Sequence, residues 1–152
     1  MQNSFVADCS LTQALEKRSI PVPCSKGQVL FKQGDAPLGL YILRNGKASL
    51  VMKDESGTEV MHLTIGAGSI LGVPAVVTKQ PYTLSALSGR GAEVCFIELS
   101  NFEDLMQAEP RLFPLVLSVL AAEVRSARIA LTGVMTKLRS RQSGASVPVL
   151  AR

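Results

Sequence analysis

The sequence predicts a mainly β domain with flanking helices, followed by one long C-terminal helix. Short strand-like segments between turn residues fill the middle of the chain, at 29–32, 40–43, 47–52, 60–63, 83–87 and 94–99. After Pro110, apolar residues recur every three or four positions, which is the spacing of a helix. Regularly spaced strands joined by turns are typical of a barrel or sandwich, so we expect the β part to be of that kind.

The composition is that of one folded domain. The chain has 152 residues, of which 47% are hydrophobic and 18% charged, so it can bury a core and is not disordered as a whole. Aromatic residues make up only 5% and Trp is absent, so we expect a core of aliphatic side chains.

The charge and the cysteine content limit which partners and which cellular compartment we expect. The net charge is +4, but the basic residues are scattered, and their one concentration, Lys137 to Arg141, fits a solvated helix end. Three widely spaced cysteines without a CxxC motif suggest reduced thiols. The N-terminus does not resemble a signal peptide, and no apolar run approaches the ~20 residues of a membrane span. We therefore expect a cytoplasmic protein without a membrane partner.

The N-terminal segment, 1–25, is expected to hold a short helix and a lead-in. Ser10 and Gln13 have the spacing of a capping box, and the helix should end before Pro21. The β domain is expected over 26–109. Asn45-Gly46 and the turn ending at Gly57 predict hairpins, because Asn and Gly adopt the positive φ that tight turns require.

The stretch from Gly66 to Ala86 is the most informative for function. Its glycines at 66, 68 and 72 precede a short apolar segment, Val73 to Val77. A glycine-rich turn that opens a helix presents backbone N–H groups, so it can cradle an anion.

In this order, Gly27, Gly34-Asp35, Asn45-Gly46, Gly57 and the 66–72 glycines resemble the cyclic-nucleotide-binding domain of the CRP-FNR family. The resemblance covers about 26 to 132. It implies a double-stranded β-helix, a jelly-roll-like β-roll, followed by a long C-terminal dimerisation helix. It also implies a phosphate-binding cassette, whose candidate residues here are Gly72, Val73, Pro74, Ala75, Gln80, Pro81, Tyr82 and Thr83.

The candidate cassette departs from the family pattern. The family's Gly-Glu pair is Gly72-Val73 here, and alignment on Leu84-Ser85-Ala86 puts Gln80 at the position of its phosphate-binding arginine. Loss of such a charge-assisted contact costs on the order of 2 to 5 kcal/mol. We therefore expect altered or lost binding of cAMP or cGMP. Lys79 or Arg90 could substitute for the arginine, and Tyr82 could either stack on a base or plug the pocket; we favour plugging.

The long helix is expected over 110–139, with Pro114 in its first turn. Its apolar residues follow the 4, 3 alternation of a coiled-coil seam, so we expect a homodimer. Phe113 and Leu117 should pack partly on the roll, which cannot cover a helix of ~45 Å. Gly133 could end the regular helix early. The expected dimer interface consists of Phe113, Leu117, Leu120, Val124, Ala127, Leu131, Val134 and Leu138.

The remaining segment, 140–152, contains Gly and Pro and is expected to be a flexible tail. The resembling regulators place a helix-turn-helix domain about here, but Arg139 to Arg152 is too short for one. We expect no direct DNA binding by this chain, unless it is a fragment of a longer one.

No residue pattern predicts catalysis or a metal centre. His62 is the single histidine and lies in a strand-like segment, where a structural role is the commoner one. Asp54-Glu55 belongs to a turn, and Ser100 with Glu103 has the spacing of a second capping box. We expect no catalytic and no metal-binding residues, and the residues indicate no cofactor; a cyclic nucleotide is suggested by the resemblance alone.

The sequence therefore predicts a non-enzymatic sensory or regulatory domain, with a possible small-molecule effector, that signals through its dimerising helix. Two alternatives stay open. The chain could be a constitutive interaction or scaffold domain without a small ligand, or a genuine cAMP-binding module that uses substitute contacts.

Overall fold

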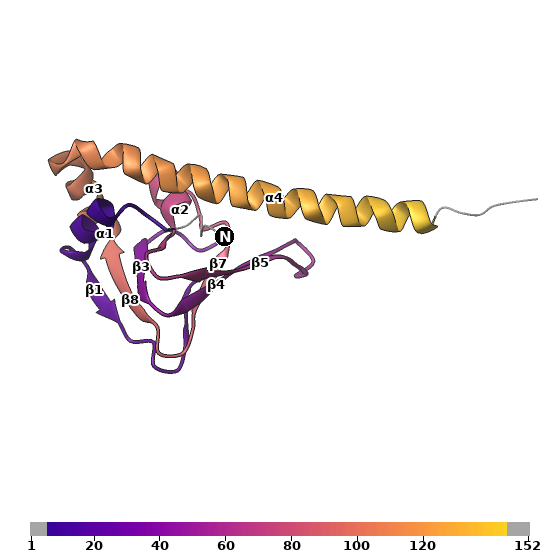
Figure 1. Ribbon diagram of the computed structural model, residues 1–152, viewed down its shortest axis with the longest axis horizontal. Helices are drawn as coiled ribbons and strands as arrows, with labels where there is room; N and C mark the ends of the chain where they lie inside the picture. The colour runs from indigo at the N-terminus through magenta and orange to yellow at the C-terminus, as the bar shows by residue number, and fades with distance from the viewer. Residues whose placement is uncertain (1–5, 146–152) are drawn as a thin grey trace, which may run out of the picture.

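The computed structural model describes residues 6–145, as a β-roll flanked by helices with one long helix across it (Figure 1). The helices and strands predicted from the sequence are present, together with two short strands, β1 and β6, that the sequence did not indicate. In chain order the elements are α1 (Cys9–Glu16), β1 (Ile20–Val22), β2 (Gln28–Phe31), β3 (Gly39–Asn45), β4 (Lys47–Lys53), β5 (Glu59–Gly66), β6 (Ile70–Leu71), α2 (Val73–Thr78), β7 (Ser85–Ser88), β8 (Glu93–Glu98), α3 (Leu99–Ala108), the 3-10 helix η1 (Pro110–Leu112) and α4 (Phe113–Ala145).

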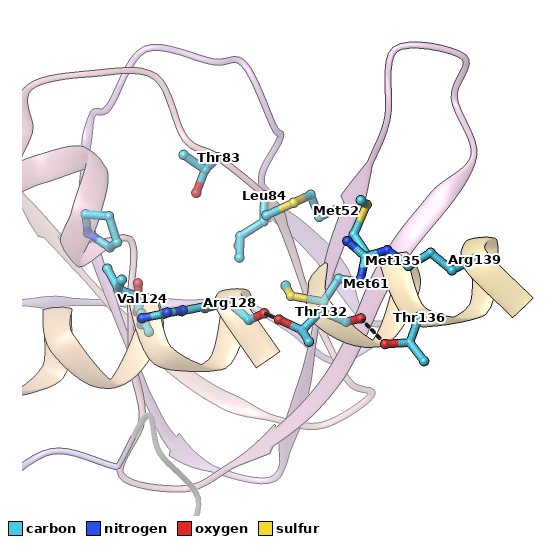
Figure 2. Close-up of a pocket in the computed structure, with 12 residues that line it drawn as sticks. Met52, Met61, Thr83, Leu84, Val124, Arg128, Thr132, Met135, Thr136 and Arg139 are labelled. Atoms are coloured by element: carbon cyan, nitrogen blue, oxygen red, sulfur yellow. Dashed lines mark hydrogen bonds between the residues drawn. The ribbon is translucent and has the colours of Figure 1, made fainter. Parts of the chain in front are cut away.

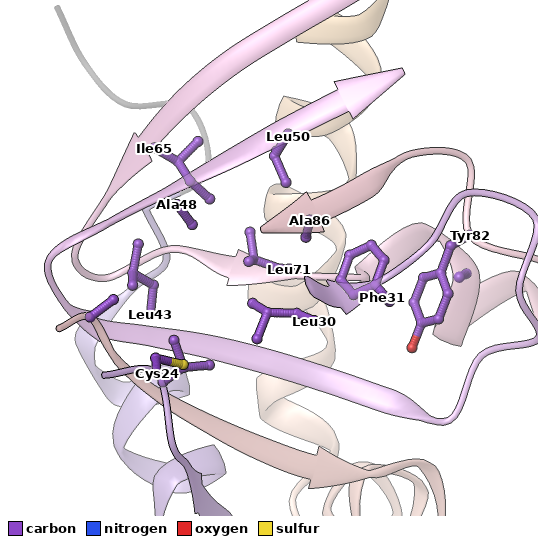
Figure 3. Close-up of a cluster of buried hydrophobic side chains, with 13 residues drawn as sticks. Cys24, Leu30, Phe31, Leu43, Ala48, Leu50, Ile65, Leu71, Tyr82 and Ala86 are labelled. Carbon is purple, nitrogen blue, oxygen red and sulfur yellow. The ribbon is translucent and has the colours of Figure 1, made fainter. Parts of the chain in front are cut away.

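Two antiparallel four-stranded sheets form the roll, in the orders β1-β8-β3-β6 and β2-β7-β4-β5. The first core cluster fills the space between them; Leu30 lies beside Phe31 and Tyr82, and Leu43 lies toward the other end of the cluster, near Cys24 (Figure 3). This architecture confirms the predicted fold class, mainly β with a jelly-roll-like roll and flanking helices.

The strand β3 explains why one sheet needs helices on its outer face. Leu40 and Ile42 belong to a second core cluster, together with Leu105 of α3 and Val116 of α4, whereas Leu43 belongs to the first cluster. Neighbouring side chains of a strand point to opposite faces, so β3 is buried on both sides. The helices α1, α3 and α4 therefore supply the outer half of the core.

The N-termini of α1 and α3 differ from the predicted capping boxes. The cap of α1 is Asp8, whose carboxylate accepts from the backbone N–H of Ser10 at 2.8 Å, so Ser10 lies inside the helix. The helix α3 begins at Leu99 without a side-chain cap, so Ser100 is not a cap either. The predicted break at Glu109-Pro110 is confirmed, because α3 ends at Ala108.

The helix α4 is longer than the sequence predicted. It has 33 residues and runs through Gly133 to Ala145. Gly133 therefore does not end the helix, and 140–145 is helical, not a flexible tail. Pro114 is accommodated in the first turn, as expected, because the first turn needs no intrahelical N–H donors. Residues 146–152 of the predicted tail lie outside the described part of the chain.

Within the described residues, no single helix is long and apolar enough to cross a membrane. The bent pair of α3 with Pro110–Ser126 meets the criteria of length and composition together, but its two parts are bent by 107° and contribute Leu105, Leu112 and Val116 to the buried core.

Candidate functional site

The candidate cassette lies where α2 follows β6. Gly72 has a φ of 93° and precedes the first residue of α2. A Cβ at this position would lie 3.1 Å from Cε1 of Tyr82 and 3.4 Å from the carbonyl oxygen of Gly39. Both the positive φ and this close approach require glycine. Gly72 thus lets the start of α2 come near Tyr82.

The ring of Tyr82 fills the interior of the cassette. The residue is 4% exposed, and its ring stacks on that of Phe31 with centroids 4.0 Å apart and planes 17° apart. Its hydroxyl donates to the carbonyl of Gly39 at 2.7 Å. Burial raises the pKa of the Tyr82 phenol, so the hydroxyl stays protonated and able to donate.

The backbone of Tyr82 is fixed as well. Its N–H donates to the carbonyl of Asp35 at 2.9 Å, and its carbonyl accepts from the N–H of Gly34 at 2.7 Å. The Gly34-Asp35 turn therefore holds the backbone of Tyr82 through two hydrogen bonds.

Of the other cassette candidates, Pro74 and Thr83 come together at the wall of a larger cavity. Val73 and Ala75 are buried, and Gln80 and Pro81 are exposed. The side chain that enters the cassette is thus that of Tyr82, not that of Gln80. Lys79, a candidate substitute cation, lies 3.3 Å from Glu103 of α3 as an exposed ion pair. Arg90 is exposed in the loop between β7 and β8.

The space left at the cassette is very small. The cavity lined by Gly72, Ala75, Tyr82 and Phe31 has a volume of about 10 Å³. A buried water needs roughly 10–15 Å³, so the cassette holds one water at most. This small cavity has no room for a ribose phosphate in this conformation, whereas the larger cavity described next shares Pro74 and Thr83 with it.

A larger cavity, here called the outer cavity, lies between α4 and the β4–β5 hairpin (Figure 2). Its volume is about 670 Å³, and its apolar wall includes Met52, Met61, Leu84 and Met135. The polar side chains along α4 are those of Glu123, Arg128, Thr132, Thr136 and Arg139.

The two threonines of the outer cavity are engaged within α4. The hydroxyl of Thr132 donates to the carbonyl of Arg128 at 2.9 Å, and that of Thr136 donates to the carbonyl of Thr132 at 3.0 Å (Figure 2). The charged groups Glu123, Arg128 and Arg139 are therefore the chemically distinctive ones in this cavity.

Glu123 is a site residue that the sequence analysis missed. It is 8% exposed, and its Oε1 has no hydrogen-bond partner within the described residues. Burial raises the pKa of its carboxyl from 4.5 to about 8. The available signal was an acidic residue inside the apolar stretch Val119 to Val124, where a charge is costly unless it is partnered.

The predicted seam lies largely on the exposed face of α4. Phe113 and Leu117 are 40% and 43% exposed, so the expectation that they pack on the roll is wrong. The residues that pack there are Leu112, Val116 and Val119. Of the other predicted interface residues, Val124 is 57% and Leu138 47% exposed, and Leu120 is half-buried. The side chains of Ala127, Leu131 and Val134 lie outside the described part.

No catalytic or metal-binding cluster appears in the described part of the chain. His62 is exposed, and its Nδ1 lies 2.9 Å from Oε1 of Glu59. No group of three or more His, Cys, Asp or Glu side chains is arranged around a metal-sized space among the described residues. Cys24 and Cys95 are buried and Cys9 is exposed, all as free thiols.

Comparison with known proteins identifies the family of this chain. A family model for the cyclic nucleotide-binding domain matches residues 21–109. The anaerobic regulatory protein of Haemophilus influenzae is 31% identical over 104 residues, which are 68% of this chain and 40% of that protein. The chain thus spans well under two thirds of that relative.

Solved structures share the fold. The Thermus thermophilus catabolite activator protein superposes with a TM-score of 0.62 at 22% identity, over 88% of this chain and 60% of that one. The regulator CLP of Xanthomonas campestris, described as responsive to c-di-GMP, gives a TM-score of 0.69 at 15% identity, over 87% and 65% of the two chains. Both likenesses concern the roll together with its C-terminal helix.

Proposed function

This chain belongs to the cyclic nucleotide-binding domain family, and we propose that it is a dimeric regulatory domain whose cyclic-nucleotide cassette is closed by its own Tyr82. Its output element is α4, which packs on the roll through one face and leaves an apolar seam on another. Most of the curated relatives are named as regulatory proteins, which supports a non-enzymatic role for this domain.

The filling of the cassette is the observation that carries this proposal. A cyclic phosphate needs a cationic or N–H-lined space. The interior next to Gly72 is instead filled by the stacked rings of Tyr82 and Phe31. To admit a ligand, Tyr82 would have to give up its hydrogen bond to Gly39 and its ring stacking. Each buried polar group left without a partner costs about 1–3 kcal/mol, so opening is disfavoured before any contact with ligand forms.

The cassette also lacks residues whose contacts with a nucleotide would offset the free-energy cost of opening. Val73 cannot accept a hydrogen bond from a ribose hydroxyl, and Lys79 is held by Glu103 on the surface. The alternative that the chain is a genuine cAMP-binding module with substitute contacts therefore has little support. Binding of a different effector, or of none, fits these residues better.

The dimer is supported by the exposed seam of α4. Phe113, Leu117, Val124 and Leu138 leave between 40% and 57% of their surface exposed. Apolar side chains at this spacing pack against the same stripe of a second helix in a coiled coil. In such a dimer, a shift of α4 on the roll would change the orientation of the two β-rolls relative to each other.

A second candidate function is a constitutive interaction domain. It is favoured by the way in which Tyr82 is fixed at its hydroxyl, its ring and its backbone, since such a site would not respond to an effector. The two candidates differ in whether a small molecule occupies the outer cavity, whose volume lies in the range of ligand pockets.

The proposal is tested by isothermal titration of the purified protein with cAMP and cGMP at modest salt. We expect no heat of binding and no shift of the thermal unfolding temperature at millimolar nucleotide. Micromolar or tighter binding of either nucleotide would contradict the closed cassette. A cooperative urea transition of the same sample serves as the control that the protein is folded.

A further inference from the structure

The outer cavity is long and has an apolar wall. Its lining residues on α4 run from Glu123 to Arg139, a distance of ~24 Å along a helix. The facing wall includes Met52 of β4 and Met61 of β5. Methionine side chains are unbranched and adapt to irregular apolar shapes, and cavities of about 670 Å³ are typical of small-molecule sites. An elongated apolar body therefore fits this space.

Arg128 and Arg139 are the cationic side chains of the outer cavity. Both are exposed, and neither makes an ion pair among the described residues. Figure 2 shows the side chain of Arg128 directed along α4 toward Val124, and that of Arg139 directed toward Met135. A guanidinium can bind a carboxylate through two parallel hydrogen bonds. The cavity thus offers positive charge to an anionic group of a ligand.

Glu123 is the buried polar residue of this site. It is 8% exposed, and its Oε1 has no hydrogen-bond partner within the described residues. Glu123 borders both the outer cavity and the small cavity at Tyr82, and of these two the outer one alone has room for more than a water molecule. Because burial raises the pKa of its carboxyl to about 8, the group is mostly protonated at neutral pH and can donate a hydrogen bond.

We propose that the outer cavity binds an elongated aliphatic carboxylate, whose head group pairs with Arg128 and accepts a hydrogen bond from Glu123 while its chain lies along Met52 and Met61. The inference rests on the proposed function, because it names the class of effector for a domain whose nucleotide cassette is closed. All the residues that it uses belong to one copy of the chain.

The positions of Arg128 and Glu123 suit a shared head group. The two residues are ~7.5 Å apart along the axis of α4, and side chains on a helix lean toward its N-terminus, so Arg128 leans toward the level of Glu123. A carboxylate between them can contact both side chains. The apolar wall next to it, which includes Leu84, lowers the local dielectric constant and so strengthens both contacts.

The same groups discriminate between head groups on one aliphatic chain. An ammonium group would be repelled by Arg128 and Arg139, and a neutral Glu123 would not offset this repulsion. An alcohol would gain the apolar contacts without the ion pair. The cavity should therefore prefer a carboxylate to an alcohol, and an alcohol to an amine.

The inference is tested by isothermal titration of the full chain with decanoate, decanol and decylamine, each below the concentration at which it forms micelles. We expect decanoate to bind once per chain and roughly tenfold or more tightly than decanol, with no binding of decylamine. Binding of several decanoate molecules per chain, or equal affinities for decanoate and decanol, would overturn a specific carboxylate site.

Two pairs of variants locate the site. Arg128→Gln should weaken decanoate binding by roughly tenfold or more and leave decanol binding unchanged. Arg125→Gln removes an exposed arginine that does not line the cavity, so it is the matched control and should have no effect. Met135→Glu puts a carboxylate on the wall and should abolish decanoate binding, whereas Ile129→Glu, 73% exposed and outside the cavity, should not.

The competing arrangement is one in which Arg128 serves Glu123 within the chain and no ligand binds between them. In that case Arg128→Gln would lower the thermal stability of the protein without ligand and leave its affinity for decanoate unchanged. This result would overturn the proposal. The proposal predicts the opposite pattern, a loss of affinity with little change in the stability of the empty protein.

The role of Glu123 is tested with two neutral replacements. Glu123→Gln keeps a hydrogen-bond donor of nearly the same shape, and Glu123→Met does not. Decanoate should bind to Glu123→Gln about as tightly as to the wild type, and several-fold more weakly to Glu123→Met. Tighter binding to both variants would mean that Glu123 is ionised and repels the ligand, which would overturn its role as a donor.

Failure of this inference can be told apart from failure of the proposed function. The dimer is tested with Leu117→Glu on the seam, which should give a monomer that still binds decanoate, because the site lies within one chain. Loss of decanoate binding in that monomer would overturn the single-chain site. If neither decanoate nor cAMP binds to the wild type, the effector class fails and the closed cassette stands. If cAMP binds and displaces decanoate, both fail.

Discussion

Tyr82 has all its polar groups satisfied inside the chain. Its hydroxyl donates to Gly39, and its backbone is bonded on both sides to the Gly34-Asp35 turn. The sequence placed Tyr82 among the candidates and favoured a plugging role. It could not show that Gln80 points to solvent, because the path of the 79–84 loop depends on those long-range hydrogen bonds.

Glu123 is the contrasting residue, and its place in the apolar stretch Val119 to Val124 is the single local sign of its burial. It stands in a helix whose outward face also carries charges, such as Arg125 and Arg128. Its burial arises because α4 lies against α2 and β5, which are distant in sequence. A residue whose environment is made entirely by tertiary packing is the kind that pattern reasoning misses.

The raised pKa of Glu123 gives a prediction for the monomer obtained with Leu117→Glu. Its carboxyl has a pKa of about 8 in the folded chain against 4.5 for a free glutamate, so the folded state keeps a proton that the unfolded state loses as pH rises. Stability should therefore fall as pH rises from about 4.5 to 8, by up to ~1.4 kcal/mol per pH unit. Leu117→Glu/Glu123→Gln should lack this loss.

The measurement is urea denaturation of both monomers at pH 5 and pH 8. The variant with Gln should have the higher free energy of unfolding. Its advantage should be larger at pH 8 than at pH 5. Equal differences at the two pH values would show that Glu123 is not buried without a partner in the monomer.

At the scale of elements, turn chemistry made most of the strands predictable. Gly46 and Gly57 adopt the positive φ expected of hairpin turns, whereas Asn45 does not. The strands on either side match the predicted segments within a few residues. The strands β1 and β6 were missed because they have three and two residues, too few for a pattern to register. They exist because they pair with β8 and β3.

The ends of the helices were less predictable than the helices themselves. Asp8 caps α1 in place of Ser10, since both residue types cap well and the choice depends on where the chain turns. The length of α4 was underestimated because the cost of one glycine, about 1 kcal/mol, is small against a helix that packs on the roll along its first half.

Gly133 gives a prediction at this scale. A Cβ at this position meets no atom within 4 Å, so alanine fits without strain. Gly133→Ala should stabilise α4 by about 0.5–1 kcal/mol, because alanine loses less backbone entropy on entering a helix. Circular dichroism at 222 nm during thermal melting should show a higher midpoint; a lower midpoint would mean that the backbone at 133 is not helical.

At the scale of the whole molecule, the roll encloses the cassette, and α4 carries the exposed apolar seam. The two sheets hold the cassette closed around Tyr82, and the second core cluster fixes the first half of α4 on the roll. The rest of α4 extends past the β4–β5 hairpin (Figure 1), and the seam residues Val124 and Leu138 are exposed on it.

The most direct test of this account is the molar mass of the wild-type protein by sedimentation equilibrium, with and without saturating cAMP. One chain has a mass of 16.2 kDa, and the two-fold dimer predicts about 32 kDa, unchanged by the nucleotide. A mass of 16.2 kDa at micromolar concentration, or a mass that depends on cAMP, would contradict a constitutive dimer with a closed cassette.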